Sequence, residues 1–237
     1  MIAKNAEKNI PKAINSVKKI VDEIIVVDTG SKDKTKDIAK SLGAKVYGFK
    51  WNDDFSKARN FALSRCTKEW ILVLDTDEMI AEKDLDKIKE LVKKKNIACR
   101  FIQRTYLNKK SRFKWNQNDN SYSEGNGYLG WKYRGIVRLF RNLPEIRFVY
   151  PIHETVKPSV LRLGKIVNSN IPIHHFSSNK DYLELLKKKA DKYKDANSFA
   201  ELAVHLYEIG RNEEAIVFAE KANKLNPKIN LISSQSS

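Results

Sequence analysis

The chain has 237 residues, of which 41% are hydrophobic and 31% are charged. This composition supplies enough apolar surface for a sizeable core, and it excludes a globally disordered chain. Lysine and arginine outnumber aspartate and glutamate by 45 to 29, and the net charge of +16 favours anionic partners without choosing among them.

The cysteines, the apolar runs and the basic charge indicate where in the cell the protein is expected. Cys66 and Cys99 form no paired motif and no metal-ligand spacing, so both are expected to be reduced and structural. The sequence shows no signal-peptide run and no stretch of about 18 apolar residues. We expect a cytoplasmic protein, with peripheral contact to the inner face of a membrane as an open alternative to simple solvation of the lysines. The basic residues match no nucleic-acid-binding motif, so nucleic acid is not an expected partner.

The first third of the chain alternates between helical and strand patterns. Ile10, Ile14 and Val17 share one helical face, and the apolar run at residues 24–27 predicts a buried strand. The following elements are a helix about Ile38 that ends at Gly43, a strand from Ala44 to Phe49, a helix from Phe55 to Cys66 and a strand from Trp70 to Leu74. This order predicts an α/β fold with a mostly parallel, Rossmann-like sheet. Its ligand crevice lies beyond the carboxyl ends of the strands, where Asp28 and Asp75 occur.

The middle of the chain changes character after a lysine-rich helix from Glu82 to Lys95. The helical period is lost between residues 98 and 158, where Ile136 to Arg141 and Ile146 to Tyr150 are predicted as strands. The polar, glycine-containing stretch from Asn116 to Gly130 is predicted to be a long loop. Long loops are often functional, so this one is expected to form the acceptor side or a lid.

The last part of the chain is predicted to be helical. A helix from Lys180 to Asp195 is followed by helices from Phe199 to Ile209 and from Glu213 to Leu225. The spacing of six residues matches one tetratricopeptide repeat: Leu202, Ala203, Gly210, Ala215, Ala222 and Pro227. One repeat cannot bury its own apolar face, so it should pack on the preceding helix or on the first domain. We predict a domain at 1–177, a short α-helical appendage at 178–228 and a disordered tail at 229–237.

The acidic cluster Asp75-Thr76-Asp77-Glu78 follows directly after a predicted buried strand. Two carboxylates separated by one residue offer hard oxygen ligands, the type that binds Mg²⁺ or Mn²⁺ beside a phosphate. Such an ion stabilises the charge that develops on a departing diphosphate. Taken alone, an Asp-x-Asp pair is more often a turn or a helix cap, and the same alternative applies to Asp28.

Three segments together resemble the donor-binding half of family 2 glycosyltransferases, which have the GT-A fold. They are Val26-Val27-Asp28-Thr29-Gly30-Ser31, the stretch from Trp51 to Asn60, and the stretch from Trp70 to Glu78. The opening residues 1–7 resemble the family's first strand and the Lys-Asn-Glu-Glu segment after it, with Ala6 in place of the usual acid. The resemblance covers roughly residues 1–176.

The resemblance implies a nucleotide-sugar donor, with a UDP-sugar foremost, and Mg²⁺ or Mn²⁺ as the cofactor. It assigns Asn5 to the donor site, Asp28 to the nucleoside, Arg59 to the nucleotide, and Asp75 to the ribose or to metal-bound water. Asp77 is implied as the more direct metal ligand. A histidine that completes the metal shell in the family aligns with His175. Strand alternation sends His174 and His175 to opposite faces, so only one can reach the site, and a structural histidine stays an alternative.

On the acceptor side, Arg138-Leu139-Phe140-Arg141 and Ile152-His153-Glu154 resemble a motif of the repeat-bearing members of the family. Glu154 is the candidate base, because inverting transfer needs a carboxylate to take the proton from the attacking hydroxyl. The alternative is that Glu154 only pairs with Arg138 or Arg141.

The preferred interpretation is an inverting transferase that moves a sugar from a nucleotide-diphosphate donor to a hydroxyl. The acceptor is a cell-envelope glycan, a lipid-linked sugar or a protein. The second interpretation is a non-catalytic nucleotide-sugar-binding scaffold whose helical repeat recruits partners. The family's first strand begins several residues before the position of Met1, so we expect either an upstream start or a shortened copy that has lost activity.

Overall fold

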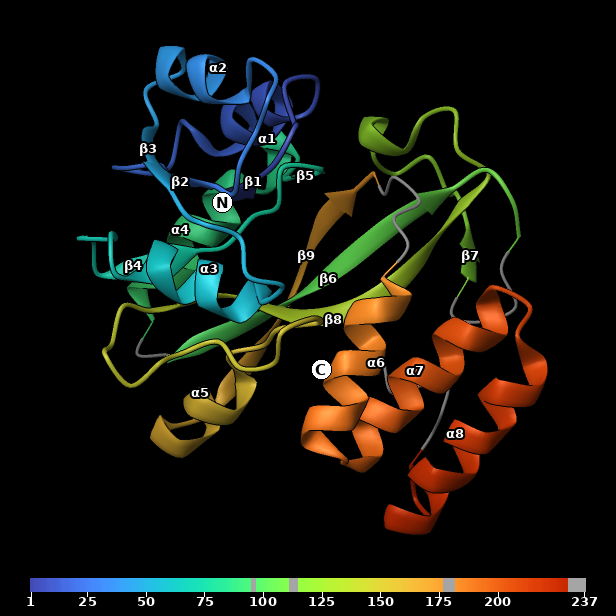
Figure 1. Cartoon of the computed structure of the whole chain (residues 1–237). Helices are drawn as coiled ribbons and strands as arrows, with labels where there is room; N and C mark the ends of the chain where they lie inside the picture. Colours follow the sequence, from blue (N-terminus) through green and yellow to red (C-terminus); the bar gives the residue numbers. More distant parts are fainter. Residues whose placement is uncertain (95–96, 111–114, 177–181, 230–237) are drawn as a thin grey trace.

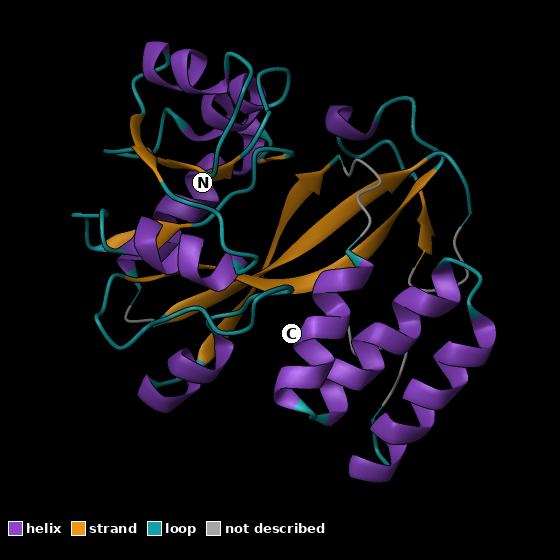
Figure 2. Cartoon of the chain, in the orientation of Figure 1, coloured by secondary structure: helices purple, strands orange, loops and turns teal. Residues whose placement is uncertain are grey.

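A computed structural model describes residues 1–94, 97–110, 115–176 and 182–229 (Figure 1). The expected domain boundary at residue 177 and the tail from residue 230 lie outside these residues. The described chain contains a small parallel sheet, a larger mixed sheet and a C-terminal group of helices (Figure 2). The expected α/β class with a helical C-terminal segment is confirmed.

The first sheet holds three parallel strands in the order β1-β2-β3, which span Ile2–Ala3, Ile25–Asp28 and Lys45–Gly48. Helix α1 (Ile10–Val17) and helix α2 (Thr35–Ser41) form the crossovers that parallel pairing requires. Ile10, Ile14 and Val26 are fully buried in one cluster, which accounts for the apolar spacing of the sequence. The carboxyl ends of β1 and β2 therefore face the same edge of the sheet.

Helix α3 (Phe55–Leu63) follows the first sheet and carries a site residue. The Asp54 side chain caps it by accepting a hydrogen bond from the Lys57 N–H at 3.1 Å. Strand β4 (Trp70–Leu72) comes next and pairs with the second sheet. The 3-10 turn Glu82–Asp84 and helix α4 (Leu85–Lys93) complete this half.

The second sheet has the order β4-β8-β6-β9-β5, with β7 paired to β8. Its further strands are β5 (Glu78–Met79), β6 (Ala98–Leu107), β7 (Trp115–Gln117), β8 (Gly130–Arg141) and β9 (Ile166–His175). Four of its five pairings are antiparallel, and only β6 and β9 run parallel. The sheet is therefore mixed rather than mostly parallel. No helix is described between β6 and β8, which fits their antiparallel pairing, because only parallel neighbours need a crossover.

The strand expected from Ile146 to Tyr150 is wrong, because side chains take over its backbone hydrogen bonds. Asn60 accepts from the Phe148 N–H at 2.8 Å and donates to the Phe148 carbonyl at 2.9 Å. The Arg147 N–H donates to the Ser159 hydroxyl at 3.1 Å, from helix α5 (Lys157–Leu163). This segment is thus fastened mainly to two helices, and its backbone pairing is limited to one isolated bridge between Val149 and Thr155.

The stretch from Asn116 to Gly130 contains the end of β7, a 3-10 turn at Ser123–Gly125 and the start of β8. Tyr122, near its centre, has its ring centroid 4.7 Å from that of His174. The turn therefore packs on the sheet.

The C-terminal helices are α6 (Leu183–Tyr193), α7 (Ala196–Glu208) and α8 (Asn212–Leu225), and α7 and α8 form a hairpin about Gly210 (Figure 1). Gly210 has φ +83°, a conformation that glycine adopts without strain. Leu186, Leu202 and Ala215 form one buried cluster with Ile152 of the preceding region. The repeat-like helices therefore pack both on α6 and on the rest of the protein. No helix in the described ranges is long and apolar enough to cross a membrane.

Candidate active site

A cavity of about 970 Å³ lies where the two sheets and the C-terminal helices meet. Its walls come from the loop after β1, the segment after β4, the facing strands β6 and β8, residues 150–155, and helices α6 and α7. The cavity collects six of the seven predicted site residues: Asn5, Arg59, Asp75, Asp77, Glu154 and His175.

Asp28, the seventh predicted residue, is buried at the end of β2 and is not among the residues that line the cavity. Its Oδ1 accepts hydrogen bonds from the backbone N–H groups of Gly30 at 3.1 Å and Ser31 at 3.0 Å. This is the turn-capping role that the sequence left open. The turn places Thr29 in the cavity wall, and Asn5 accepts from the Lys32 N–H at 2.8 Å to hold the same edge.

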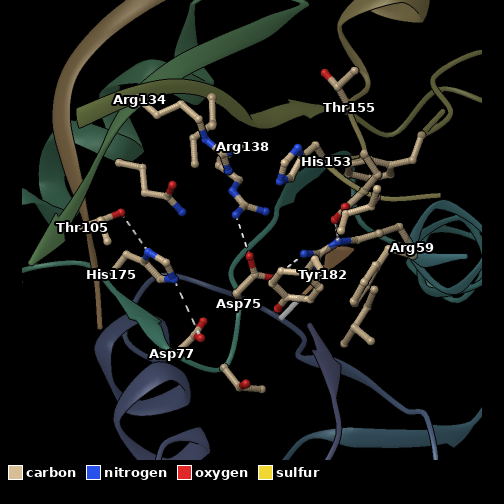
Figure 3. A pocket seen from close by; sticks show the side chains of 18 of the residues that line it. Arg59, Asp75, Asp77, Thr105, Arg134, Arg138, His153, Thr155, His175 and Tyr182 are labelled. Carbon is tan, nitrogen blue, oxygen red and sulfur yellow. Dashed lines mark hydrogen bonds and ion pairs between the residues drawn. The ribbon is translucent and has the colours of Figure 1, made fainter. Parts of the chain in front are cut away.

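Five charged side chains form an arginine–carboxylate network at the cavity: Arg59, Asp75, Glu78, Arg138 and Glu154. Figure 3 shows Arg59, Asp75 and Arg138 of this network. Arg59 donates from Nη2 to Asp75 Oδ1 and from Nε to Glu154 Oε1, the latter at 2.9 Å. Arg138 Nη2 donates to Asp75 Oδ2 at 2.7 Å and to Glu78 Oε1 at 2.8 Å. Glu154 thus pairs with Arg59, which neither sequence alternative named.

The local fold explains why Arg138 reaches this network. Along β8 the pairing passes from Val137 opposite Arg100 to Leu139 opposite Cys99, so Arg138 is the extra residue of a β-bulge. Arg138 lies an even number of residues from Lys132 and Arg134, which also line the cavity, so strand alternation alone puts these three side chains on one face. The motif that contains Arg138 was predicted, but the bulge was not.

The electrostatics of the network keep Asp75 ionised. Burial alone would raise the pKa of Asp75, but the guanidinium groups of Arg138 and Arg59 lower it well below its usual value. Both carboxylate oxygens of Asp75 accept from these arginines, and its backbone N–H donates to Glu78 Oε2 at 2.8 Å. Asp75 therefore holds two guanidinium groups at the wall. The structural role of the fully buried Glu78 was not predicted, although it ends the acidic cluster.

Asp77 and His175 face each other across the end of the second sheet. Antiparallel pairing of β5 and β9 sets Glu78 opposite His175, which brings His175 Nε2 to 3.8 Å from Asp77 Oδ2 (Figure 3). The Thr105 hydroxyl lies 2.9 Å from His175 Nδ1. Burial opposes the charged form of His175, but Asp77 and Glu78 outweigh it and raise the pKa.

His174 points to the opposite face, as strand alternation predicts. It is fully buried, and its Nδ1 lies 2.7 Å from the Tyr106 hydroxyl. Burial lowers the pKa of His174 to about 4, so this side chain is neutral at physiological pH. Of the two histidines, the structure brings His175 into the cavity wall.

Asp77 and His175 fit a divalent cation as part of its ligand set. Two ligand atoms that each lie roughly 2.1 Å from one ion can be at most roughly 4.2 Å apart, and the 3.8 Å observed here falls within that limit. If Nδ1 donates to Thr105, Nε2 is left free to bind an ion. Within the described ranges no group of three or more His, Cys, Asp or Glu side chains could hold a metal. The fit thus needs further ligands from a bound molecule or water.

The opposite wall is held by three residues that we call the His153 clamp: His153, Lys189 and Glu201. Glu201 Oε2, on α7, lies 3.0 Å from His153 Nδ1 and accepts from Lys189 Nζ on α6 at 2.6 Å. The side chains of Lys189 and Glu201 are both 2% exposed. The clamp therefore ties two C-terminal helices to the residue beside Glu154, and sequence analysis did not predict it.

Residues 150–155 form a constrained loop around this clamp. Tyr150 and His153 have positive φ angles of 72° and 51°, a region that non-glycine residues rarely adopt. The Pro151 carbonyl accepts from the Phe55 N–H at 2.8 Å, and Lys189 Nζ lies 4.4 Å from the centroid of the Tyr150 ring. The surrounding helices thus fix the backbone that presents Glu154.

The chain matches the family model for Glycosyl transferase family 2 over residues 1–150, and it belongs to that family. It is 39% identical over 164 residues to a TPR repeat-containing protein of Synechococcus elongatus, covering 69% of this chain and 36% of that protein. It is 47% identical over 88 residues to an uncharacterized glycosyltransferase of Rickettsia typhi, covering 37% of this chain and 30% of that protein. The chain spans about a third of the length of these curated relatives.

Solved structures show the same fold at low sequence identity. Staphylococcus aureus TarS in complex with UDP-GlcNAc superposes with a TM-score of 0.52 at 16% identity, covering 94% of this chain and 71% of that one. Glucosyl-3-phosphoglycerate synthase from Mycobacterium tuberculosis, in complex with Mn²⁺ and UDP-glucose, gives 0.51 at 17% identity, covering 87% and 76%. The expected GT-A fold is confirmed.

Proposed function

We propose that the protein is an inverting glycosyltransferase that moves a sugar from a UDP-sugar to a hydroxyl acceptor. The observation that carries this proposal is one cavity with the Asp77–His175 pair on one wall and Glu154 on another. The two similar folds were solved with UDP-sugars, which supports this donor class.

The donor end of the cavity is the wall around Asp77. Asp77 and His175 would hold Mg²⁺ or Mn²⁺ here, and the ion would supply positive charge to the departing diphosphate. Asn5 and Thr29 form the edge at which the nucleoside would enter. Asp28 shapes this edge through its turn, and its assignment to the nucleoside stays a prediction.

Glu154 is the general base in this proposal. Its Oε1 accepts from Arg59, and no hydrogen bond to its Oε2 occurs among the described residues. A carboxylate held in this way can accept the proton of an acceptor hydroxyl while the hydroxyl attacks the anomeric carbon. Arg59 links this step to the donor side, because the same guanidinium binds Asp75.

The acceptor class that we propose is a cell-envelope glycan, a lipid-linked sugar or a protein. The net charge of +16 supports a cytoplasmic enzyme that meets its acceptor at the inner face of the membrane. The stretch from Asn116 to Gly130 was expected to form the acceptor side or a lid. None of residues 116–130 lines the cavity, and the first lining residue of β8 is Lys132. We therefore do not assign this stretch that role.

Calorimetric titration with UDP and with GDP, each with and without Mn²⁺, tests the donor site. We expect metal-dependent UDP binding that Asp77→Ala weakens at least about tenfold. Asp86→Ala is the matched control, because Asp86 is exposed and only pairs with Lys89. Binding of neither nucleotide, or binding that Asp77→Ala leaves unchanged, would contradict the proposed donor site.

A further inference from the structure

Strand β8 presents three cations to the cavity: Lys132, Arg134 and Arg138. Two of them are neutralised by the protein itself. Lys132 Nζ pairs with Glu208 of α7 at 3.0 Å, and Arg138 pairs with Asp75 and Glu78 in the arginine–carboxylate network.

Arg134 differs from its two neighbours. The difference is that no carboxylate among the described residues forms an ion pair with it. Its Nε, like that of Arg138, is buried without a hydrogen-bond partner. An arginine keeps its charge in proteins, and a charge withdrawn from water without a partner is costly. Burial, followed by the like charge of Arg138, lowers the pKa of Arg134, although the charges of Glu78, Glu154 and Glu201 act in the opposite direction. An anionic group of a ligand in the cavity would give Arg134 the direct partner that the protein does not supply.

The sheet order places Arg134 away from the proposed metal ligands. In the order β8-β6-β9-β5, Arg134 lies two strands from His175 and three from β5, which directly follows Asp77. Strands lie about 4.8 Å apart, so the backbones are offset by roughly 10 Å and 14 Å across the sheet. A long side chain can shorten this offset, as Arg138 of β8 does where it binds Glu78 of β5, but Arg134 forms no such bond among the described residues. In Figure 3 Arg134 lies at the upper left beside Arg138, whereas Asp77 lies at the lower left next to His175.

Arg134 also lies on the side of the cavity that the C-terminal helices close. The adjacent Lys132 binds α7 through Glu208, and His153 binds the same helix through Glu201. Glu154, the proposed base, follows His153 directly. A group held at Arg134 would therefore belong to the molecule that approaches Glu154 rather than to the donor diphosphate.

We propose that Arg134 binds an oxyanion, a phosphate or carboxylate group, carried by the sugar acceptor. The planar guanidinium donates two parallel hydrogen bonds to such a group, which would fix its orientation as well as its position. This assignment to the acceptor rests on the proposed transferase function, whereas the unpaired cation in the cavity does not. The enzyme would then prefer anionic acceptors over neutral ones of the same shape.

The test uses inorganic phosphate and acetate as probes on the full chain saturated with UDP and Mg²⁺, at constant ionic strength. Calorimetric titration with each probe measures the binding, because it works equally in variants that lack the Arg134 guanidinium. We expect Arg134→Gln to weaken binding of at least one probe about tenfold or more, while Arg134→Lys retains most of it. The control is Lys132→Gln, which removes a cation that Glu208 already neutralises and should change probe affinity by no more than about twofold.

The same variants show whether the anion that binds Arg134 belongs to the acceptor or to the donor diphosphate. UDP affinity that stays within about threefold of wild type in Arg134→Gln supports an acceptor subsite. A parallel loss of UDP affinity would overturn the proposal and assign Arg134 to the donor diphosphate. Equal probe binding by wild type and Arg134→Gln would also overturn it. Failure of the wild type to bind UDP contradicts the proposed function itself, and it is seen before either probe is added.

Discussion

The two walls of the cavity are built in different ways. The arginine–carboxylate network belongs to the family region, on α3, the segment after β4, and the bulge of β8. The His153 clamp instead joins the loop at residues 150–155 to helices α6 and α7 through Glu201 and Lys189. The comparison teaches that the C-terminal helices contribute to the cavity wall, where Leu185 and Glu208 line it. Glu154 belongs to the network through Arg59 and directly follows His153 of the clamp.

The largest expected effect comes from the residue shared by both walls. Glu154→Gln keeps an oxygen that can accept from Arg59 but removes the carboxylate that takes up a proton. Turnover should fall about 10²- to 10⁴-fold, the usual contribution of a general base. UDP release from a UDP-sugar measures turnover, and calorimetry measures donor affinity, which should stay near that of wild type. If both fell together, Glu154 would be a structural partner of Arg59 instead.

The next effect tests the clamp. Glu201→Gln leaves Lys189 buried without its carboxylate, so the free energy of unfolding should fall by about 3–5 kcal/mol. Urea unfolding measures the loss. Glu214→Gln is the matched control, since the pair between Glu214 and Arg211 is exposed and should contribute no more than about 1 kcal/mol. Equal losses in the two variants would show that the clamp does not hold the helices to the loop.

A smaller effect follows from the titration of Glu201. Burial alone would raise its pKa, but the bond to His153 and the charge of Lys189 bring the pKa below its usual value. Because the folded-state pKa lies below the unfolded value of about 4.3, Glu201 stabilises the protein above that pH. The contribution is lost as the pH falls through the folded-state pKa.

The difference in melting temperature between wild type and Glu201→Gln should therefore be constant at pH 6 to 7 and narrow on acidification below about pH 4. Thermal unfolding followed by circular dichroism across this range measures it. A difference that does not change with pH would mean that Glu201 does not act through its charge.

The smallest effect is expected at a contact between the same regions that lies in solvent. Lys188 on α6 binds Asp53 at 2.6 Å, but both side chains are more than half exposed. Lys188→Ala should change the free energy of unfolding by no more than about 1 kcal/mol and leave turnover near that of wild type. A loss as large as that of Glu201→Gln would locate the coupling of the helices in this surface pair.

The positions of Asp75 and Asp77 at the cavity could be predicted better than the contacts of Arg138 and Glu154, for physical reasons. The buried strands and the residues at their ends follow from local hydrophobic period, so Asp75 and Asp77 could be placed from their neighbours alone. Other features depend on residues far apart in the chain. Asn60 forms hydrogen bonds to Phe148, and the bulge at Arg138 arises where β8 pairs with β6. No local pattern contains them, which is why the predicted strand at Ile146 failed and the mixed sheet was missed.

The same reason explains the His153 clamp. In the sequence, Lys189 and Glu201 look like solvent-exposed charged residues of amphipathic helices. Only their burial in the structure distinguishes them from solvated ion pairs. The sequence around Arg134 did not indicate a binding role. The proposal for Arg134 depends on the lack of an ion-pair partner among the described residues, which a sequence does not reveal. A partner, or its lack, becomes visible only in three dimensions.

The central claim is that this cavity turns over a nucleotide-sugar rather than only binding one. The most direct test is the release of UDP from UDP-glucose and UDP-N-acetylglucosamine in the presence of Mn²⁺, by wild type, Asp77→Ala and the Asp86→Ala control. We predict slow release by wild type and the control, with Asp77→Ala reduced at least about tenfold. Tight UDP binding by wild type without release from either donor, even with cell-envelope glycans added as acceptors, would contradict the account and favour a nucleotide-sugar-binding scaffold.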